Sequence, residues 1–133
     1  MFKVDFLVTL PDTDAAGIFF FGNYFRRIHE TYELFMKKID FSLSDIIYHS
    51  DFFLLIAHAE ATYKKSMRLG EKYSVNLKVE KAGRTSFVLK YEILNNFGEI
   101  TTAIKTVHVA VDKKSNKKIK LPVDLHKQLL KYM

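Results

Sequence analysis

The segment from Tyr24 to Lys38 is the only long stretch of this chain whose apolar residues recur at helical spacing. They fall at three- and four-residue steps and define one apolar face, made of Tyr24, Phe25, Ile28, Tyr32, Phe35, Met36 and Ile39. Charged residues such as Arg26, Glu33 and Lys37 fall largely on the other side. The sequence therefore predicts a single long helix that buries one face.

The rest of the chain has the composition of strands. Residues 2–10 alternate loosely and are expected to form a strand that ends at Pro11. After Asp51 the chain is rich in Val, Ile, Phe, Tyr and Thr, and turn signals divide it into four predicted strands: Phe53–Lys65, Tyr73–Lys81, Ser86–Leu94 and Glu99–Val111. Because the loops between these long strands are short, we expect an antiparallel meander.

Two shorter helices complete the prediction. Residues 40–50 are expected to form a turn and a short helix, with Ser42 or Ser44 as its cap. Its residues Ile46, Ile47 and Tyr48 are predicted to pack inward. A C-terminal helix is expected to begin at Pro122.

These elements indicate an α+β fold in a single domain spanning residues 1–133. The chain is 48% hydrophobic, which is enough material for a proper core. One long helix can cover only one face of a five-stranded sheet, so the sheet is expected to curl around it. Other surface then remains for self-association.

Composition excludes several classes of protein. There is no cysteine, hence no disulfide framework and no thiolate nucleophile or ligand, which fits a reducing compartment. Charges interrupt the apolar N-terminus, which therefore does not read as a signal peptide, and no apolar run is long enough to span a membrane. We expect a soluble cytoplasmic protein. The net charge of +6 fits a solvated lysine-rich surface or a polyanionic small ligand better than nucleic acid.

The segment Asp12-Thr13-Asp14-Ala15-Ala16-Gly17 stands shortly before the predicted long helix. A carboxylate beside the free N–H groups of a helix start is suited to acyl transfer, because the carboxylate attacks or activates water while the N–H groups hold the oxyanion. The alternative is ordinary capping or a turn. Cation binding needs more oxygen ligands than this segment has, and no histidine spacing suggests a metal, so none is expected.

These residues carry a resemblance. The run Asp12–Ile18 followed by Asn23-Tyr24, in this order of elements, resembles the hotdog-fold acyl-CoA thioesterases of the 4-hydroxybenzoyl-CoA thioesterase type. A second set makes the chain most similar to the 1,4-dihydroxy-2-naphthoyl-CoA thioesterases of phylloquinone and menaquinone synthesis, namely His29-Glu30, Tyr32-Glu33, Ala57–Ala61, Arg68–Glu71 and Gly83–Phe87. The resemblance covers nearly the whole chain.

The resemblance implies a hotdog fold and hydrolysis of an aromatic acyl-CoA thioester, with no cofactor besides the coenzyme A of the substrate. It also implies homodimers that stack into homotetramers, with a site between two subunits. Two alternatives stay open. One is a generalist thioesterase for short or aromatic acyl-CoA, such as 4-hydroxybenzoyl-CoA, and the other is a domain that binds acyl-CoA without hydrolysing it.

By the same resemblance, Asp14 is the catalytic carboxylate, acting either as nucleophile or as general base. The backbone N–H of Phe21, with that of Gly22, polarises the thioester oxygen. Gly17 allows the tight backbone path of the loop, and Asp12 orients it. Related bacterial enzymes carry histidine where this chain has Phe21, and an apolar ring there suits an aromatic acyl group.

Other carboxylates compete with Asp14. In a different branch of the fold the catalytic carboxylate lies on the helix, which makes Glu30 or Glu33 the alternative. His58 and Glu60 are predicted to share one face of a strand and to pair there, in a structural or interfacial role.

The remaining candidates concern substrate binding. Gly17, Tyr24 and His29 are expected to take part in substrate binding, although a helix histidine is more often structural. Around the next turn, the residues are expected either to hold the coenzyme A arm or to be solvated turn and strand residues, namely Lys81, Arg84, Thr85 and Ser86. The lysines of 113–120 are expected either to reach the phosphates or to form a solvated turn. The apolar segment Ile18–Phe21 is predicted to contact another subunit or to line a pocket.

Overall fold

The computed structural model describes all residues from Met1 to Met133. Five strands and three α-helices follow each other in the predicted order: β1 (Phe2–Leu7), α1 (Tyr24–Lys38), α2 (Leu43–His49), β2 (Phe52–Tyr63), β3 (Lys72–Ala82), β4 (Ser86–Leu94), β5 (Ile100–Asp112) and α3 (Val123–Leu130). Two short 3₁₀ turns, Leu10–Asp12 and Phe21–Asn23, flank the loop before α1. No helix is both long and apolar enough to cross a membrane.

The strands form one antiparallel sheet in the order β1-β3-β4-β5-β2. The predicted meander is correct for β3, β4 and β5 but wrong for β2, which pairs with β5 and not with β3. The segment between β2 and β3 therefore crosses from one edge of the sheet to the far side. As a result β2, twelve residues long, is an outer strand with one edge unpaired.

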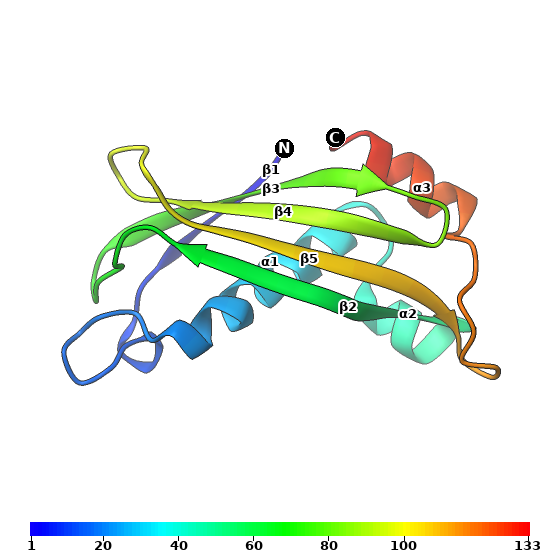
Figure 1. Ribbon diagram of the computed structural model, residues 1–133, viewed down its shortest axis with the longest axis horizontal. Coiled ribbons are helices and arrows are strands. Elements are labelled where there is room, and N and C mark those ends of the chain that lie inside the picture. The colour runs from blue at the N-terminus through cyan, green and yellow to red at the C-terminus, as the bar shows by residue number, and fades with distance from the viewer.

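The core lies between α1 and one face of the sheet (Figure 1). Ile28, Phe35 and Met36 of α1 are fully buried, and so are the alternate residues Leu89, Tyr91 and Ile93 of β4. The periodicities of the helix and of the strands thus meet at one interface, as the sequence predicts.

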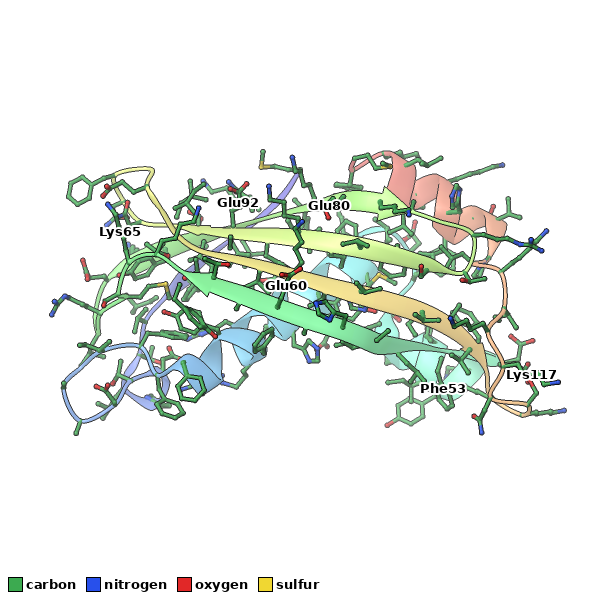
Figure 2. All side chains as sticks on the ribbon, in the orientation of Figure 1. Phe53, Glu60, Lys65, Glu80, Glu92 and Lys117 are labelled. Atoms are coloured by element: carbon green, nitrogen blue, oxygen red, sulfur yellow. The ribbon has the colours of Figure 1, made fainter.

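The other face of the sheet has no helix over it. Figure 2 shows Glu60, Glu80 and Glu92 on this outer face. The face also carries lysines, and the amine of Lys105 lies 2.9 Å from the carboxylate of Glu80. Charged side chains suit a face that is not buried within this chain.

Helix α2 packs differently from the prediction. Ser42 is its cap, since its hydroxyl accepts a hydrogen bond from the Asp45 N–H at 3.3 Å. Ile46 is buried as predicted, but Ile47 and Tyr48 are 53% and 77% exposed. A helix of seven residues makes about two turns, so successive residues such as these cannot all face the core.

Candidate active site

The loop before α1 is fastened to the helix through Asp12, whose side chain is fully buried. Arg26 and Arg27 of the first helical turn both pair with its carboxylate, Arg27 at 2.6 Å. The N–H and hydroxyl of Thr9 donate to the same carboxylate at 2.9 and 3.1 Å. These four donors explain why a carboxylate can be buried here.

The charge of Asp12 is stabilised by this setting. Burial alone would raise the pKa of its carboxyl, but the hydrogen bonds from Arg27 and Thr9 and the charge of Arg27 outweigh burial and lower the pKa. Asn23 adds a further tie, since its side-chain amide donates to the backbone carbonyl of Asp12 at 3.0 Å. The structure therefore places Asp12 where it orients the loop.

Asp14 lies at the exposed tip of this loop. Its Oδ1 accepts hydrogen bonds from the N–H groups of Ala16, at 2.8 Å, and Ile18, at 3.1 Å, while Oδ2 has no hydrogen-bond partner. Gly17 has φ +75°, a left-handed conformation that strains any other residue, as the predicted tight path requires. The turn alternative is thus also correct for Asp14, but it occupies only one carboxylate oxygen.

The two backbone donors named from the sequence open the 3₁₀ turn that leads into α1. The N–H groups of Phe21 and Gly22 have no hydrogen-bond acceptor within the chain, as expected at the start of a helical segment. The bridge between Thr13 and Phe19 folds the loop back, so Asp14 and this turn belong to one compact unit.

A cavity of about 280 Å³ adjoins this unit. It is lined by Ile18, Phe19, Phe21 and Tyr24, together with Tyr63 at the end of β2. This confirms the prediction that the apolar segment Ile18–Phe21 lines a pocket. Tyr24 is 4% exposed and packs between the rings of Phe19 and Tyr63, and burial is the largest cause that raises its pKa. Phe21 by contrast is 65% exposed.

The competing carboxylates are placed less favourably. Glu30 pairs with Arg26 at 3.1 Å and with Arg27 at 3.4 Å, the arginines that also hold Asp12. Glu33 is exposed and makes no ion pair. His58 and Glu60 do lie close, at 3.8 Å, but both are 61% exposed on β2.

His29 is brought to a second cavity, of about 440 Å³, between α1, α2 and the start of β2. Eight of its nine lining residues are hydrophobic, among them Ile47, Phe53 and Ile56, and His29 is the remaining one. Tyr32 of α1 also lines it. Its size and apolar character are typical of a site for an aromatic group.

Arg84 lies in a third cavity, of about 730 Å³, beside α3. Lys120, His126 and Lys127 line it too, and none of these four side chains makes an ion pair. Lys81, Thr85 and Ser86 are near in sequence but do not line it. Of the lysines in 113–120, Lys113 is instead bound to the carbonyls of α2.

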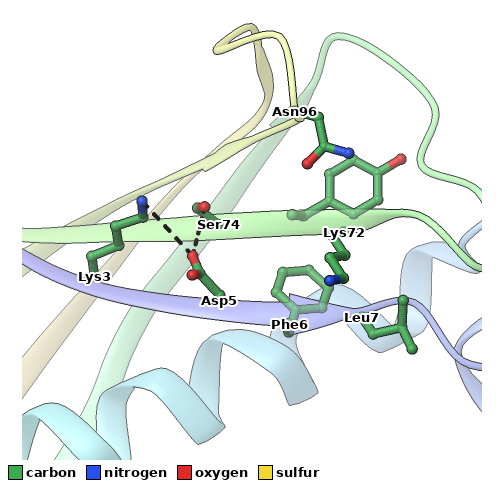
Figure 3. A pocket seen from close by; sticks show the side chains of 8 residues that line it. Lys3, Asp5, Phe6, Leu7, Lys72, Ser74 and Asn96 are labelled. Carbon is green, nitrogen blue, oxygen red and sulfur yellow. Dashed lines mark hydrogen bonds and ion pairs between the residues drawn. The ribbon is translucent and has the colours of Figure 1, made fainter.

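A further cavity, at the β1 edge, holds none of the predicted site residues. Figure 3 shows its polar wall, where Asp5 accepts a hydrogen bond from Ser74 at 2.7 Å and lies 3.9 Å from the Lys3 amine. Both contacts use the carboxylate of Asp5: an ion pair with Lys3 within β1 and a hydrogen bond from Ser74 of β3.

The candidate residues thus fall at opposite ends of the molecule. Lys65, just beyond the end of β2, lines the 280 Å³ cavity beside the Asp14 loop, whereas Phe53, at the start of β2, lines the cavity of His29. Figure 2 shows these two residues far apart. Twelve residues of strand span about 35 to 40 Å. Arg84, in the turn before β4, lies at the Phe53 end as well. One chain alone therefore does not bring Asp14 to the cavity of His29 or to the cavity of Arg84.

Sequence reasoning missed a buried polar cluster under α1. Tyr32, Tyr91, Thr106 and His108 gather there, each at most 5% exposed. The alternation along β5 could have indicated this cluster, because it places the polar residues Thr102, Thr106 and His108 on the face toward the core.

The chain matches the thioesterase-like superfamily over residues 8–129. A 1,4-dihydroxy-2-naphthoyl-CoA hydrolase from Synechocystis is 32% identical over 116 residues, covering 86% of this chain and 84% of that protein. One from Prochlorococcus marinus is 32% identical over 121 residues, covering 86% and 77%.

Solved structures agree with this match. A 1,4-dihydroxy-2-naphthoyl-CoA thioesterase from Synechocystis superposes with a TM-score of 0.91 at 29% identity, covering 97% of this chain and 95% of that one. A DHNA-CoA thioesterase from Staphylococcus aureus superposes with a TM-score of 0.86 at 28% identity, covering 97% and 88%. The predicted hotdog fold is confirmed.

Proposed function

Because the chain belongs to the thioesterase-like superfamily, we propose that it hydrolyses an aromatic acyl-CoA, with 1,4-dihydroxy-2-naphthoyl-CoA of phylloquinone and menaquinone synthesis as the first candidate. One observation carries this proposal. The loop unit offers a free carboxylate oxygen on Asp14 and two free backbone donors, at Phe21 and Gly22, in one segment held to α1 by Asp12.

In the proposed reaction, the N–H groups of Phe21 and Gly22 hold the thioester oxygen as it becomes negative. Asp14 either attacks the carbonyl carbon, which expels the coenzyme A thiolate and forms a mixed anhydride that water cleaves, or removes a proton from the attacking water. Both routes consume one water and release the acid and coenzyme A. Neither needs a cofactor.

We further propose that each site is built from two copies of the chain. The unpaired edge of β2 carries exposed apolar residues, with Leu55 at 50%, Ile56 at 41% and Tyr63 at 47%. Natural proteins cover a long edge of this kind, and a two-fold axis pairs a strand with itself antiparallel. Pairing about the middle of β2 places the loop end of one chain against the Phe53 end of its partner.

This arrangement gives the separated cavities a common use. The partner's apolar cavity, with His29 at its rim, receives the aromatic acyl group beside Asp14. The partner's basic cavity around Arg84 then suits the phosphates of coenzyme A, because its cations have no carboxylate partner within the chain. Roles for Lys81, Thr85 and Ser86, stacking into tetramers and a cytoplasmic location stay predictions from the sequence.

Asp14→Asn tests the proposal. Asparagine keeps the Oδ1 that caps the loop but can neither attack a thioester nor accept a proton, so kcat should fall at least about 100-fold. The assay follows coenzyme A release with a thiol-detecting dye. Asp51→Asn, at an exposed carboxylate outside the cavities, is the control and should keep full activity.

The same assay separates the alternatives when it is run with 1,4-dihydroxy-2-naphthoyl-CoA, 4-hydroxybenzoyl-CoA, benzoyl-CoA and a fatty acyl-CoA. A strong preference for the naphthoyl substrate supports the role in quinone synthesis. Equal rates indicate a generalist. Near-normal turnover by Asp14→Asn would remove Asp14 from the mechanism, and binding without any cleavage would indicate a non-catalytic domain.

A further inference from the structure

The polar cluster beneath α1 holds the two buried side-chain atoms of this chain that lack a hydrogen-bond partner, Tyr32 Oη and His108 Nδ1. They belong to neighbouring rings, whose centroids are 4.3 Å apart. Tyr32 is 5% exposed and His108 is fully buried. A buried polar atom left unpaired costs about 1–3 kcal/mol, so two of them on rings in contact point to a group that binds there.

The hydrogen bonds around His108 define what that group must be. The Thr106 hydroxyl donates to Tyr91 Oη at 3.3 Å and lies 2.7 Å from His108 Nε2. With its one proton given to Tyr91, the Thr106 hydroxyl accepts from Nε2–H, which leaves Nδ1 as a bare acceptor. Burial, and then the nearby charge of His29, lower the pKa of His108 to about 3, so the ring is neutral at pH 7.

The unpaired atoms therefore offer one acceptor on His108 and a hydroxyl on Tyr32 that both donates and accepts. A hydroxyl group fits this pair, because it donates its proton to Nδ1 and accepts from Tyr32 Oη. A carboxylate or a carbonyl group has no proton to donate, so it would leave Nδ1 unpaired.

Tyr32 also connects this pair to the apolar cavity, since it is a wall residue of that 440 Å³ space. Apart from Tyr32, the other cavity residue with a polar group is His29 at the exposed side. A planar apolar group that enters the cavity thus contacts Tyr32 in its wall, and the ring of His108 packs against that tyrosine.

We propose that Tyr32 and His108 determine specificity by binding a hydroxyl on the ring of the acyl group. The pair then favours hydroxylated aromatic acyl-CoA over the same ring without the hydroxyl. This inference rests on the proposed function and on the use of this cavity for the acyl group. Sites that hydrogen-bond a substrate hydroxyl reject the analogue lacking it strongly, because their own polar groups are left unpaired.

The test compares kcat/KM within matched substrate pairs. These pairs are 1,4-dihydroxy-2-naphthoyl-CoA with 2-naphthoyl-CoA, and 4-hydroxybenzoyl-CoA with benzoyl-CoA. In at least one pair the wild type should prefer the hydroxylated member by about tenfold or more. Tyr32→Phe, which removes only the hydroxyl, should reduce that preference several-fold through a higher KM for the hydroxylated member. Tyr48→Phe, at a hydroxyl that is 77% exposed and does not line the cavity, should leave the preference unchanged.

The outcomes separate this inference from the proposed function. If Tyr32→Phe alters stability or the rate on both members equally, the pair is structural and the inference is wrong. If the wild type cleaves no substrate, the proposed function fails, and calorimetry with 1-hydroxy-2-naphthoate and 2-naphthoate then decides the inference. Equal affinity of the wild type for these two acids would overturn it, and a preference for the hydroxy acid that Tyr32→Phe abolishes would support it.

Discussion

At the scale of single residues, His108 couples folding to pH. Its pKa falls from an ordinary value of 6.5 to about 3 because burial disfavours the charged ring. Between those two pH values His108 binds a proton in the unfolded chain but stays neutral in the folded chain. The free energy of unfolding therefore rises with pH across this window, by up to about 1.4 kcal/mol per pH unit. Above pH 6.5 His108 no longer makes stability depend on pH.

We predict that His108→Gln makes stability less dependent on pH. Between pH 6.5 and 5, where few carboxylates titrate, the wild type should lose stability steadily and the variant should lose much less. The variant should also be less stable at pH 7, by about 1–3 kcal/mol, because a buried hydrogen bond is disturbed. Urea unfolding at several pH values measures both effects. His58→Gln is the control, and equal slopes in wild type and His108→Gln would contradict the assignment.

The two loop aspartates show what can be predicted at this scale. The sequence identified Asp12 as the residue that orients the loop, and its ties to Arg26, Arg27 and Thr9 agree with that. Which cations would hold it was not predictable, because both arginines lie on the polar side of the helix. His108 escaped notice because a lone histidine in a strand pattern gives no sign of whether it is paired.

At the scale of elements, α2 depends on a single lysine from another part of the chain. The Lys113 amine, just after β5, donates to the carbonyls of Ile46 at 2.9 Å, Ile47 at 2.8 Å and Ser50 at 2.5 Å. These carbonyls close the C-terminal end of a seven-residue helix, too short to be stable alone. The charge also suits the negative end of the helix.

We predict that Lys113→Met loosens α2. Methionine retains much of the side-chain length but donates no hydrogen bond, so the free energy of unfolding should fall by about 1–2 kcal/mol. Amide hydrogen exchange within Leu43–His49 should accelerate more than exchange in α1. Lys114→Met, at the next and exposed residue, should change stability by less than about 0.5 kcal/mol. Unchanged exchange in α2 would show that the lysine is not what holds it.

Elements with strong local periodicity were predictable, and their partners were not. The predicted bounds of α1 and β4 agree with the structure, because apolar residues recur at three- and four-residue steps along α1 and alternate along β4. The position of β2 at the edge of the sheet depends on its pairing with β5. Along the chain, these two strands are separated by β3 and β4. No pattern within β2 encodes that choice, and the same holds for α2, whose Ile47 and Tyr48 look like core residues.

At the scale of the whole molecule, the proposed site joins the loop of one chain to the cavity of another. Asp14→Asn damages the first part. Ile47→Trp, at a half-exposed cavity residue, should fill the second without disturbing the core. Each variant alone should be inactive, because every site in its dimer lacks the same part.

We predict that the two inactive variants complement each other. Unfolding and refolding them together should restore activity to about a quarter of the wild-type level, since half of the dimers are mixed and each mixed dimer has one intact site. The recovered rate of coenzyme A release is the measurement, with each variant refolded alone as control. No recovery, despite mixed dimers seen by mass spectrometry of tagged chains, would place the whole site within one chain.

The unpaired edge of β2 also has a consequence for how such an enzyme behaves on dilution. A separated chain retains every reactive residue, yet in the proposed assembly it possesses no complete site. Below the dissociation constant of the pair, the rate would therefore fall with the square of the protein concentration and not in simple proportion. The amount of enzyme in a cell would then act as a threshold, below which synthesis of more chain raises activity faster than it raises protein.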